Sequence, residues 1–389
     1  MLHHRAAKTA AACASAAVWS ATTRDLRHQD DSMVCLAHGH GHWRLLPRTD
    51  QTNLQTEPYL LRPDLKFGRE SRHWWGVCDM DIVRNKSVIG RPPRAAVLQQ
   101  WVPQGNGCAS LRKHQGSLPD VGVLSCAFCS QYAGRTVLFV GDSVQGELFL
   151  AFASILGVIS AKANPGQEGC RRVAPRGSGP AELDVSIEAC KEGPQGVTVR
   201  FIRNELLWLD PQINARARHP DRKFGAPALM LCDWFSAVAA ADLVVMNRGY
   251  HSLTDPKIDM HMQQLNETVA GVASLMRTQP VPLQKRIVYR GTHGSMHGCF
   301  AEVDPIERPW NEVAARMASR SNAQYNWRSV EAREARAKAL LSSLRIPYLD
   351  TFVSTSYRPG GRMPPGNCNH FCLPGPVDDW VRLLLAYWT

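Results

Sequence analysis

The sequence predicts an α/β fold in which a parallel sheet is covered by helices on both faces. The clearest observation is the segment 137–156, where four apolar residues are followed by a Gly-Asp-Ser turn and a helical pattern. A short apolar run fits a buried strand, and apolar residues spaced by three or four fit a helix. Strands and helical stretches then alternate to the C-terminus, which is typical of a parallel sheet flanked by helices.

The expected elements follow one another from residue 135 onward. Strands are predicted at 136–141, 197–203, 241–247, 286–291 and 346–349, and helices at 143–156, 260–277, 309–320, 329–344 and 376–387. Segment 160–196 is rich in glycine and proline, so we expect a loop-rich insertion there. Residues 1–65 are polar and lack periodicity, which predicts a mobile N-terminal tail with a weak targeting pattern in its Ala-rich start.

The start of the helix predicted at 143–156 holds the first candidate for chemistry. Ser143 follows Gly141 and Asp142 at the end of a strand, where open α/β sheets place their ligands. Backbone N–H groups at a helix start can also stabilise an oxyanion. Gly-Asp-Ser is equally a good strand-to-helix turn with Asp142 or Ser143 as N-cap, so the turn alone leaves both interpretations open.

Charge and cysteine content restrict the partners and the compartment. A formal charge of +11 fits either a well-solvated basic surface or attraction to an acidic polysaccharide or a membrane. Lys/Arg runs with interleaved aromatic residues are missing, which argues against a nucleic-acid partner. The even number of twelve cysteines favours disulfides in the secretory pathway. We expect no metal and no cofactor. The sequence contains no run of 18 apolar residues, so a membrane anchor is not visible in it. Association with a membrane surface stays open.

Residues 367–380 read Asn-Cys-Asn-His-Phe-Cys-Leu-Pro-Gly-Pro-Val-Asp-Asp-Trp. This block resembles the C-terminal block of the trichome birefringence-like and PC-esterase family, Asp-Cys-x-His-aromatic-Cys-Leu-Pro-Gly-x-x-Asp-x-Trp. Internal blocks around Asn247 and Arg290 fit the same order, so the resemblance covers residues 66–389. It implies a three-layer SGNH-hydrolase-like sheet. Residues 66–132 would form a small cysteine-bearing N-terminal subdomain and residues 133–389 the catalytic domain.

The resemblance also implies a serine-dependent acyl transfer. Ser143 would be the nucleophile and His370 the base, since a serine hydroxyl attacks poorly until an imidazole accepts its proton. Asn247 would offer its amide to the oxyanion, or else make a structural Asx-turn. The other candidates for the oxyanion site or substrate cleft are Gly141, Asp142, Gly249, Arg203 and Arg290, although either arginine could instead make a surface ion pair. The candidate disulfide cysteines are Cys78, Cys108, Cys299, Cys368 and Cys372.

One position departs from the family pattern. Asn367 stands where the family has the aspartate that orients and neutralises the catalytic histidine. An amide oxygen can accept a hydrogen bond from an imidazole, but it cannot neutralise the imidazolium that forms in the transition state. Segment 358–362 lacks a second acid that the family often has. Asp350 and Asp378 are the carboxylates nearby in sequence, and Asp378 is expected to cap the last helix. The triad acid is therefore unassigned.

Three functions are compatible with these residues. The first is an O-acetyltransferase that modifies polysaccharide hydroxyls through an acyl-Ser143 intermediate, in the Golgi lumen or outside the cell, with an unspecified acyl donor. The second is an esterase of the same fold that removes acetyl groups from glycans. The third is a glycan-binding homologue whose catalysis is weakened because Asn367 replaces the triad aspartate.

Overall fold

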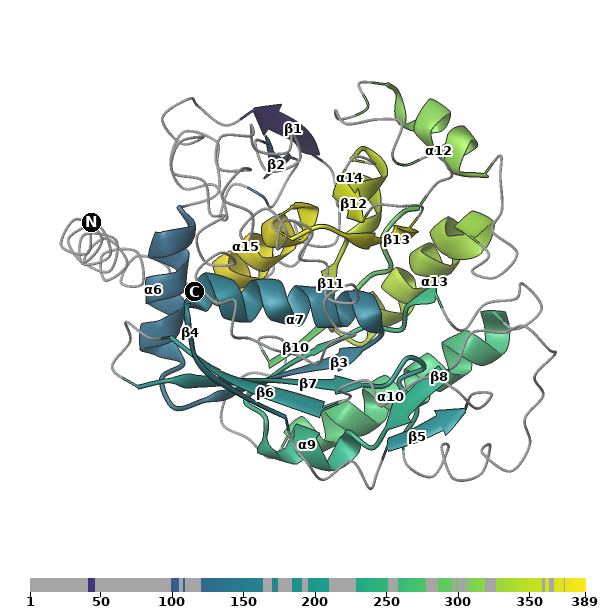
Figure 1. Ribbon diagram of the computed structural model, residues 1–389. Coiled ribbons are helices and arrows are strands. Elements are labelled where there is room, and N and C mark those ends of the chain that lie inside the picture. The colour runs from purple at the N-terminus through teal and green to yellow at the C-terminus, as the bar shows by residue number, and fades with distance from the viewer. Residues whose placement is uncertain are drawn as a thin grey trace.

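A seven-stranded sheet organises the described part of the chain (Figure 1). The computed structural model describes residues 41–45, 99–104, 108, 120–163, 170–173, 184–190, 195–209, 229–250, 258–277, 286–295, 299, 306, 308–318, 327–358, 361–363, 367–373 and 375–389. The strand order is β11-β10-β9-β3-β7-β6-β4. In that order the strands are Tyr348–Leu349, Ile287–Arg290, Leu243–Met246, Thr136–Gly141, Val197–Arg203, Asp184–Ala189 and Val158–Ala163.

The sheet has a parallel half and an antiparallel edge. Strands β11, β10, β9, β3 and β7 run parallel, whereas β6 and β4 pair antiparallel at one edge. The predicted strands match the parallel half. The loop-rich prediction for 160–196 is wrong where β4, β5 (Cys170–Val173) and β6 run, because the glycines and prolines that suggested loops lie between these strands.

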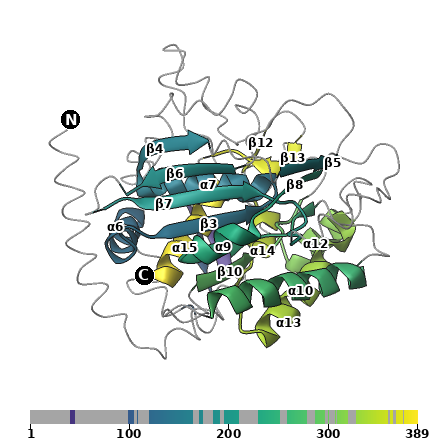
Figure 2. The same cartoon turned by 90° about the horizontal axis from the view of Figure 1, so that it is seen from below.

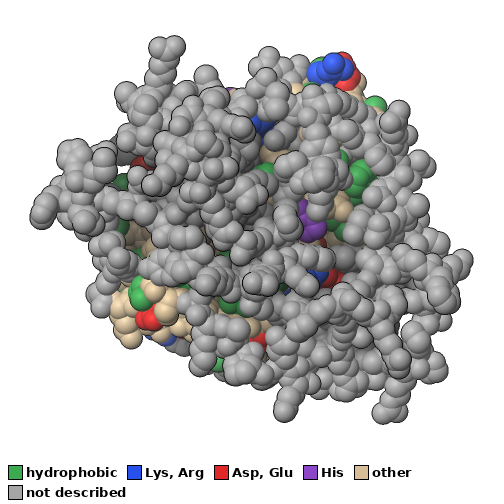
Figure 3. Space-filling view, viewed as in Figure 1, with side chains coloured by type: hydrophobic (Ala, Val, Ile, Leu, Met, Phe, Trp, Pro, Cys, Tyr) green, Lys and Arg blue, Asp and Glu red, His purple; other side chains and the backbone are tan. Residues whose placement is uncertain are grey.

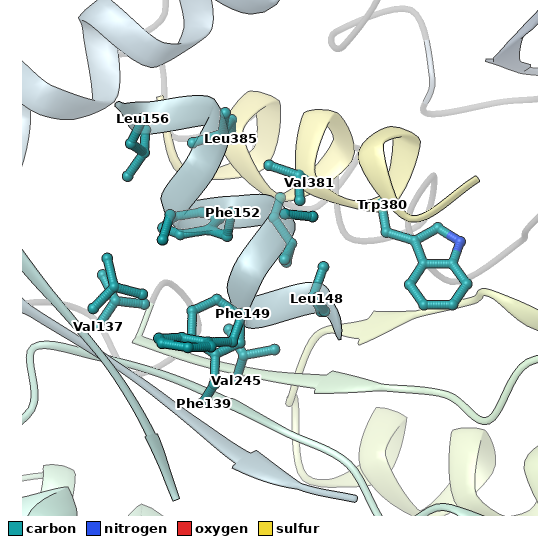
Figure 4. Close-up of a cluster of buried hydrophobic side chains, with 14 of the residues drawn as sticks. Val137, Phe139, Leu148, Phe149, Phe152, Leu156, Val245, Trp380, Val381 and Leu385 are labelled. Carbon is teal, nitrogen blue, oxygen red and sulfur yellow. The ribbon is translucent and has the colours of Figure 1, made fainter. Parts of the chain in front are cut away.

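One face of the sheet is covered by α7 (Ser143–Leu156), which lies under α15 (Pro376–Trp388) and beside α6 (Val121–Gln131) (Figure 1). Helix α7 is buried on nearly every side, since it packs against the sheet and two helices at once. Phe149 faces Phe139 and Val245 of the sheet, while Val381 and Leu385 of α15 lie on the opposite side of the helix (Figure 4). Gly157, at a φ of 81°, ends α7 in a conformation that favours glycine.

The other face is covered by α9 (Phe235–Ala240), α10 (Ile258–Met276) and α13 (Val330–Ser343) (Figure 2). Alternate residues of each strand point to opposite faces. On β3, Val137 and Phe139 belong to the core under α7, whereas Leu138 and Val140 belong to the core under α10. The helices predicted at 260–277 and 329–344 correspond to α10 and α13.

Smaller elements surround the C-terminal half. They are α12 (Trp310–Ala318), the 3-10 helix η7 (Trp327–Ser329), α14 (Phe352–Ser356) and three two-stranded pairs. The pairs are β12 (Arg362–Met363) with β13 (Asn367–Phe371), β5 with β8 (Leu229–Cys232), and β1 (Gly41–Leu45) with β2 (Gln99–Pro103). The tail predicted at 1–65 therefore contains a strand, and Trp43 of β1 is tied to α14 by a 3.0 Å hydrogen bond to the Ser354 carbonyl.

Disulfides join elements that are distant in sequence. Cys129 of α6 bonds Cys190 after β6, and Cys299 bonds Cys368 of β13. Cys108 and Cys372 are disulfide-bonded as well, whereas Cys78 lies outside the described residues. These bonds indicate an oxidising, secretory-type environment. Within the described ranges, no helix has the length and apolarity needed to cross a bilayer.

The α/β fold with helices on both faces is thus confirmed, and its finer assignment to the SGNH type stays a prediction. Helix α6 contacts both α7 and α15. The boundary predicted at residue 132 separates α6 from the sheet that it helps to cover, and that boundary also stays a prediction.

Candidate active site

Ser143 lies at the first position of α7, directly beyond the carboxyl end of the central strand β3. Asp142 is the N-cap, and its Oδ1 accepts hydrogen bonds from the N–H groups of Val144 and Gln145 at 3.1 and 3.0 Å. The N–H of Gly146 donates to the Asp142 carbonyl. The N–H of Ser143 belongs to the same first turn, and N–H groups at a helix start can stabilise a developing oxyanion.

His370 meets Ser143 across the top of the sheet. Its Nε2 lies 2.7 Å from Ser143 Oγ, although the two residues are 227 positions apart in sequence. Ser143 is 9% exposed, and His370 is partly buried at the end of β13. A histidine side chain reaches the surface on the face shown in Figure 3. The structure thus brings the predicted nucleophile and the predicted base into hydrogen-bond contact.

A buried polar network lies beneath the serine turn. Arg290, at the end of β10, places Nη2 3.4 Å from Asp142 Oδ1 and donates from Nε to Gln145 Oε1 at 2.8 Å. Gln145 in turn donates to the Val245 carbonyl at 2.9 Å. Burial lowers the pKa of Arg290, and the Asp142 carboxylate opposes that shift. The alternative of a surface ion pair for Arg290 is therefore wrong, because this pair is buried and anchors the turn.

Gly249 and Asn247 shape the neighbouring loop after β9. A Cβ at Gly249 would overlap the Asp142 carboxylate, so glycine is needed here for close approach. Asn247 is fully buried and donates from Nδ2 to the Arg290 carbonyl at 2.8 Å. A side-chain amide has two hydrogens, and this bond uses one of them. The oxyanion role of Asn247 stays a prediction, and its structural role is to join the ends of β9 and β10.

Arg203 ends β7 directly beside the serine turn, since it pairs in register with Gly141. Its guanidinium is mostly buried and bonds Glu205, with Nε 3.0 Å from Oε1. A surface ion pair is therefore not what Arg203 makes. Asn204 donates to the carbonyls of Trp208 and Cys232, which gives it a structural role.

The segment that carries His370 is held through the next residue, Phe371. Glu147 of α7 accepts a 3.2 Å hydrogen bond from the Phe371 N–H, and the Arg362 guanidinium stacks 3.8 Å from the Phe371 ring centre. His293 and Trp380 contact other sides of that ring. Our sequence reasoning did not identify Glu147, Arg362 or His293. The available signal was that Glu147 lies four residues after Ser143, on the same helical face.

Burial controls the charge of these groups. It raises the pKa of Glu147 well above its ordinary value, and the neighbouring Arg362 and Arg290 only partly offset that shift. Burial lowers the pKa of His293 well below its ordinary value, helped by the positive charges of Arg362 and Arg290. Burial also lowers the pKa of Arg362, to about 10. Burial therefore favours the neutral forms of Glu147 and His293, and the Arg362 guanidinium acts on both groups.

The carboxylates near the C-terminus have structural roles. Asp378 accepts a 2.7 Å hydrogen bond from the Gly375 N–H and caps α15, as the sequence predicted. Asp350 accepts from the Phe352 N–H at 3.0 Å and lies 3.8 Å from the Lys338 ammonium. The side chain of Asn367 lies outside the described residues, so its contact with His370 stays a prediction.

The arrangement is suited to nucleophilic chemistry. A hydroxyl in contact with an imidazole, at a helix start and at the carboxyl edge of a sheet, is the geometry that serine-dependent acyl transfer requires. Among the described residues, no group of three His, Cys, Asp or Glu side chains is placed to hold a metal ion. In comparisons with known proteins, no family model and no curated protein matches this chain.

Proposed function

We propose that this protein is a serine-dependent O-acyltransferase that places acetyl groups on polysaccharide hydroxyls through an acyl-Ser143 intermediate. The observation that carries the proposal is the 2.7 Å contact between Ser143 Oγ and His370 Nε2. The resemblance of residues 367–380 to the trichome birefringence-like and PC-esterase block supports the substrate class. The proposal needs no cofactor, because proton transfer and acyl transfer use side chains alone.

The reaction would proceed in two halves. Ser143 Oγ attacks the donor carbonyl while His370 Nε2 takes the hydroxyl proton, and the Ser143 N–H stabilises the oxyanion. The tetrahedral intermediate collapses, and His370 returns the proton to the leaving group. A sugar hydroxyl then gives its proton to His370 and attacks the carbonyl of the acyl-serine. When this second tetrahedral intermediate collapses, the bond to Ser143 Oγ breaks, the acetylated sugar leaves, and His370 returns the proton to Ser143 Oγ. General-base catalysis of this kind is typically worth about 10²–10⁴ in rate.

Charge and disulfides support the proposed location and acceptor. The net charge of +11 would attract an acidic glycan, and the disulfides fit the Golgi lumen or the extracellular space. We propose a polysaccharide acceptor that carries hydroxyls beside acidic groups.

The experiment is incubation with an activated acetyl ester such as 4-nitrophenyl acetate, followed by mass spectrometry of the peptide that contains Ser143. Wild type should gain one acetyl group on Ser143 and release 4-nitrophenol, whereas Ser143→Ala should lose nearly all of both. Ser154→Ala, a substitution of a buried serine near the other end of α7, is the matched control. Equal rates in wild type and Ser143→Ala would exclude Ser143 as the nucleophile.

The acceptor is tested by adding an oligosaccharide to the same reaction. Growth of acetylated sugar at the expense of free acetate identifies a transferase. Acetate alone, together with release of acetate from acetylated glycans, identifies the esterase.

A second candidate is a glycan-binding protein with weakened catalysis, which Asn367 favours because it replaces the family aspartate. Glycan binding without acetylation of Ser143 would support this candidate.

A further inference from the structure

Glu147 connects the nucleophile helix to the segment that carries the base. It follows Ser143 by one helical turn, on the same face of α7. Its Oε2 accepts the N–H of Phe371, which is 224 residues away in sequence and directly follows His370. Among the described residues, its Oε1 has no hydrogen-bond partner, and the side chain is fully buried. Burying a carboxyl costs free energy unless hydrogen bonds compensate, so its position here calls for a structural or chemical role.

Phe371 is held on several sides at once. The Arg362 guanidinium covers its ring at 3.8 Å, with His293 at 4.7 Å and Trp380 at 5.2 Å between ring centres. Arg362 also donates to the Gly294 carbonyl. These contacts fix the ring of Phe371, whereas the hydrogen bond from its backbone N–H to Glu147 ties the backbone to the helix that presents Ser143.

We propose that Glu147 is a positioning residue that sets the distance from His370 to Ser143 through the backbone N–H of Phe371. This inference rests on the proposed function. Because Ser143 and Glu147 belong to one rigid helix, the bond to Phe371 fixes the histidine backbone relative to the nucleophile. Displacement of a reacting group by about 1 Å can cost about 10² in rate, so such a tie has a direct effect on turnover.

The role requires an acceptor oxygen rather than a negative charge. Burial raises the pKa of Glu147 well above its ordinary value and so favours the neutral carboxyl, which still accepts through one oxygen. A charged Glu147 would instead do the work of the aspartate that Asn367 replaces in the family pattern, because a nearby anion favours the charged form of a histidine. The two roles differ for Glu147→Gln, which keeps the acceptor oxygen but has no charge. If the oxygen matters, this variant keeps its activity, and if the charge matters, it loses activity.

The test compares Glu147→Gln with Glu147→Leu in the full-length protein, with 4-nitrophenyl acetate as substrate. Glu147→Gln keeps an acceptor oxygen and should remain within about threefold of wild type in kcat. Glu147→Leu removes the acceptor and should lower kcat by about tenfold or more with little change in KM. Leu156→Ala, at the far end of α7, is the control for general destabilisation and should keep its kcat at a temperature where it is folded.

The outcomes separate the two roles. Wild-type kcat in Glu147→Leu would overturn the proposal, and so would a Glu147→Gln variant as slow as Glu147→Leu. If Glu147→Leu does not fold, Glu147→Met supplies a flexible side chain without an acceptor oxygen and replaces it.

A second readout does not depend on activity. The ring signals of His370 can be assigned by NMR from their loss in His370→Gln and then followed against pH. Glu147→Leu should shift these signals, whereas Glu147→Gln should leave them near their wild-type positions. If wild type shows no Ser143-dependent acetylation, the proposed function fails and the NMR comparison alone decides the positioning role. Unchanged His370 signals in Glu147→Leu would overturn that role.

Discussion

The two halves of the candidate site are held in different ways. The serine turn is built from neighbours in sequence: β3 leads into Gly141, Asp142 caps α7, and the cap bonds the next residues of the helix. The local frame of the histidine segment is its short pairing with β12. The position of this short β-ribbon depends on a disulfide to Cys299 and a hydrogen bond to Glu147.

The serine turn is thus part of the sheet and its covering helix. The histidine segment is instead joined to that core by contacts between residues far apart in the sequence. The strand, the cap and the helix are parts of the packed core, so the elements of the sheet themselves position the serine. The histidine is positioned only when groups far apart in the chain have come together. Substitutions in the serine turn should therefore lower both stability and activity, whereas loss of a tie to the histidine segment should be recognised by a lower kcat in the folded protein.

The largest effect is expected from Asp142→Ala, which breaks the serine half. The substitution removes the helix cap and leaves Arg290 buried without its counterion, and breaking a buried ion pair typically costs about 3–5 kcal/mol. Urea unfolding should show the loss of stability, and the ester assay should show loss of activity. Asp259→Ala is the matched control, since the Asp259 pair with Arg336 is exposed and such pairs are worth about 0–1 kcal/mol. Equal destabilisation by both variants would contradict the assigned role of Asp142.

The second effect tests the histidine half by removing the Cys299–Cys368 bond with a double serine substitution. Loss of a native disulfide typically costs about 2–5 kcal/mol. The Cys129–Cys190 bond is the matched control, because it closes a similar span of 61 residues compared with 69 and lies away from the site. Both double variants should melt earlier, but only loss of Cys299–Cys368 should lower kcat at a temperature where both are folded. Equal kcat values would show that the histidine segment needs no covalent tie.

The same difference explains how much of the structure could be predicted from sequence. Helix α7 was predicted with its observed bounds because its apolar spacing and the Asp142 cap are local signals. Strand β6 was missed although Val185, Ile187 and Ala189 are all buried, because the surrounding glycines and prolines dominated the interpretation.

In the candidate site too, residues with local sequence signals were predicted from those signals, and residues that depend on distant contacts were not. Ser143 was identified from a local turn, whereas His370 was identified through a family resemblance and Glu147 was not identified at all. The partner of Glu147 is a backbone N–H in a distant segment, and no property of residues near 147 in the sequence announces that contact.

The third prediction concerns Asn367, which stands where the resemblance would place the triad aspartate. If Asn367 occupies the acid position, Asn367→Asp places a carboxylate where it stabilises the imidazolium formed during attack. Turnover should then rise by one or more factors of ten, each equal to about 1.4 kcal/mol of barrier. The rate should be measured against pH for both proteins, with Ser143→Ala as the blank. His370 should titrate higher in the variant, because a nearby negative charge favours its charged form. A fast wild type and an unchanged variant would place the acid elsewhere.

The smallest effect is a pH slope in stability from Asp379 of α15, the helix that follows the histidine segment. Burial raises the pKa of Asp379 from 3.8 to about 7, although Arg382 at 3.8 Å opposes the shift. The folded state therefore holds this proton over a pH range in which the unfolded chain has released it. The associated stability is fully present below about pH 4 and is lost as the pH rises through about 7, with a slope below about 1.4 kcal/mol per pH unit.

Asp379→Asn imitates the protonated carboxyl and should remove this slope. Urea unfolding of both proteins from pH 4 to pH 8 should give similar stabilities at the acidic end and a more stable variant at the basic end. The ester assay should show the same pH dependence in both, because Asp379 acts on the packing of α15 and not on Ser143 or His370. A pH profile of activity that changes with Asp379→Asn would mean that α15 transmits its titration to the histidine segment. The contact of Trp380 in α15 with Phe371 would then carry the charge state of Asp379 to the histidine segment.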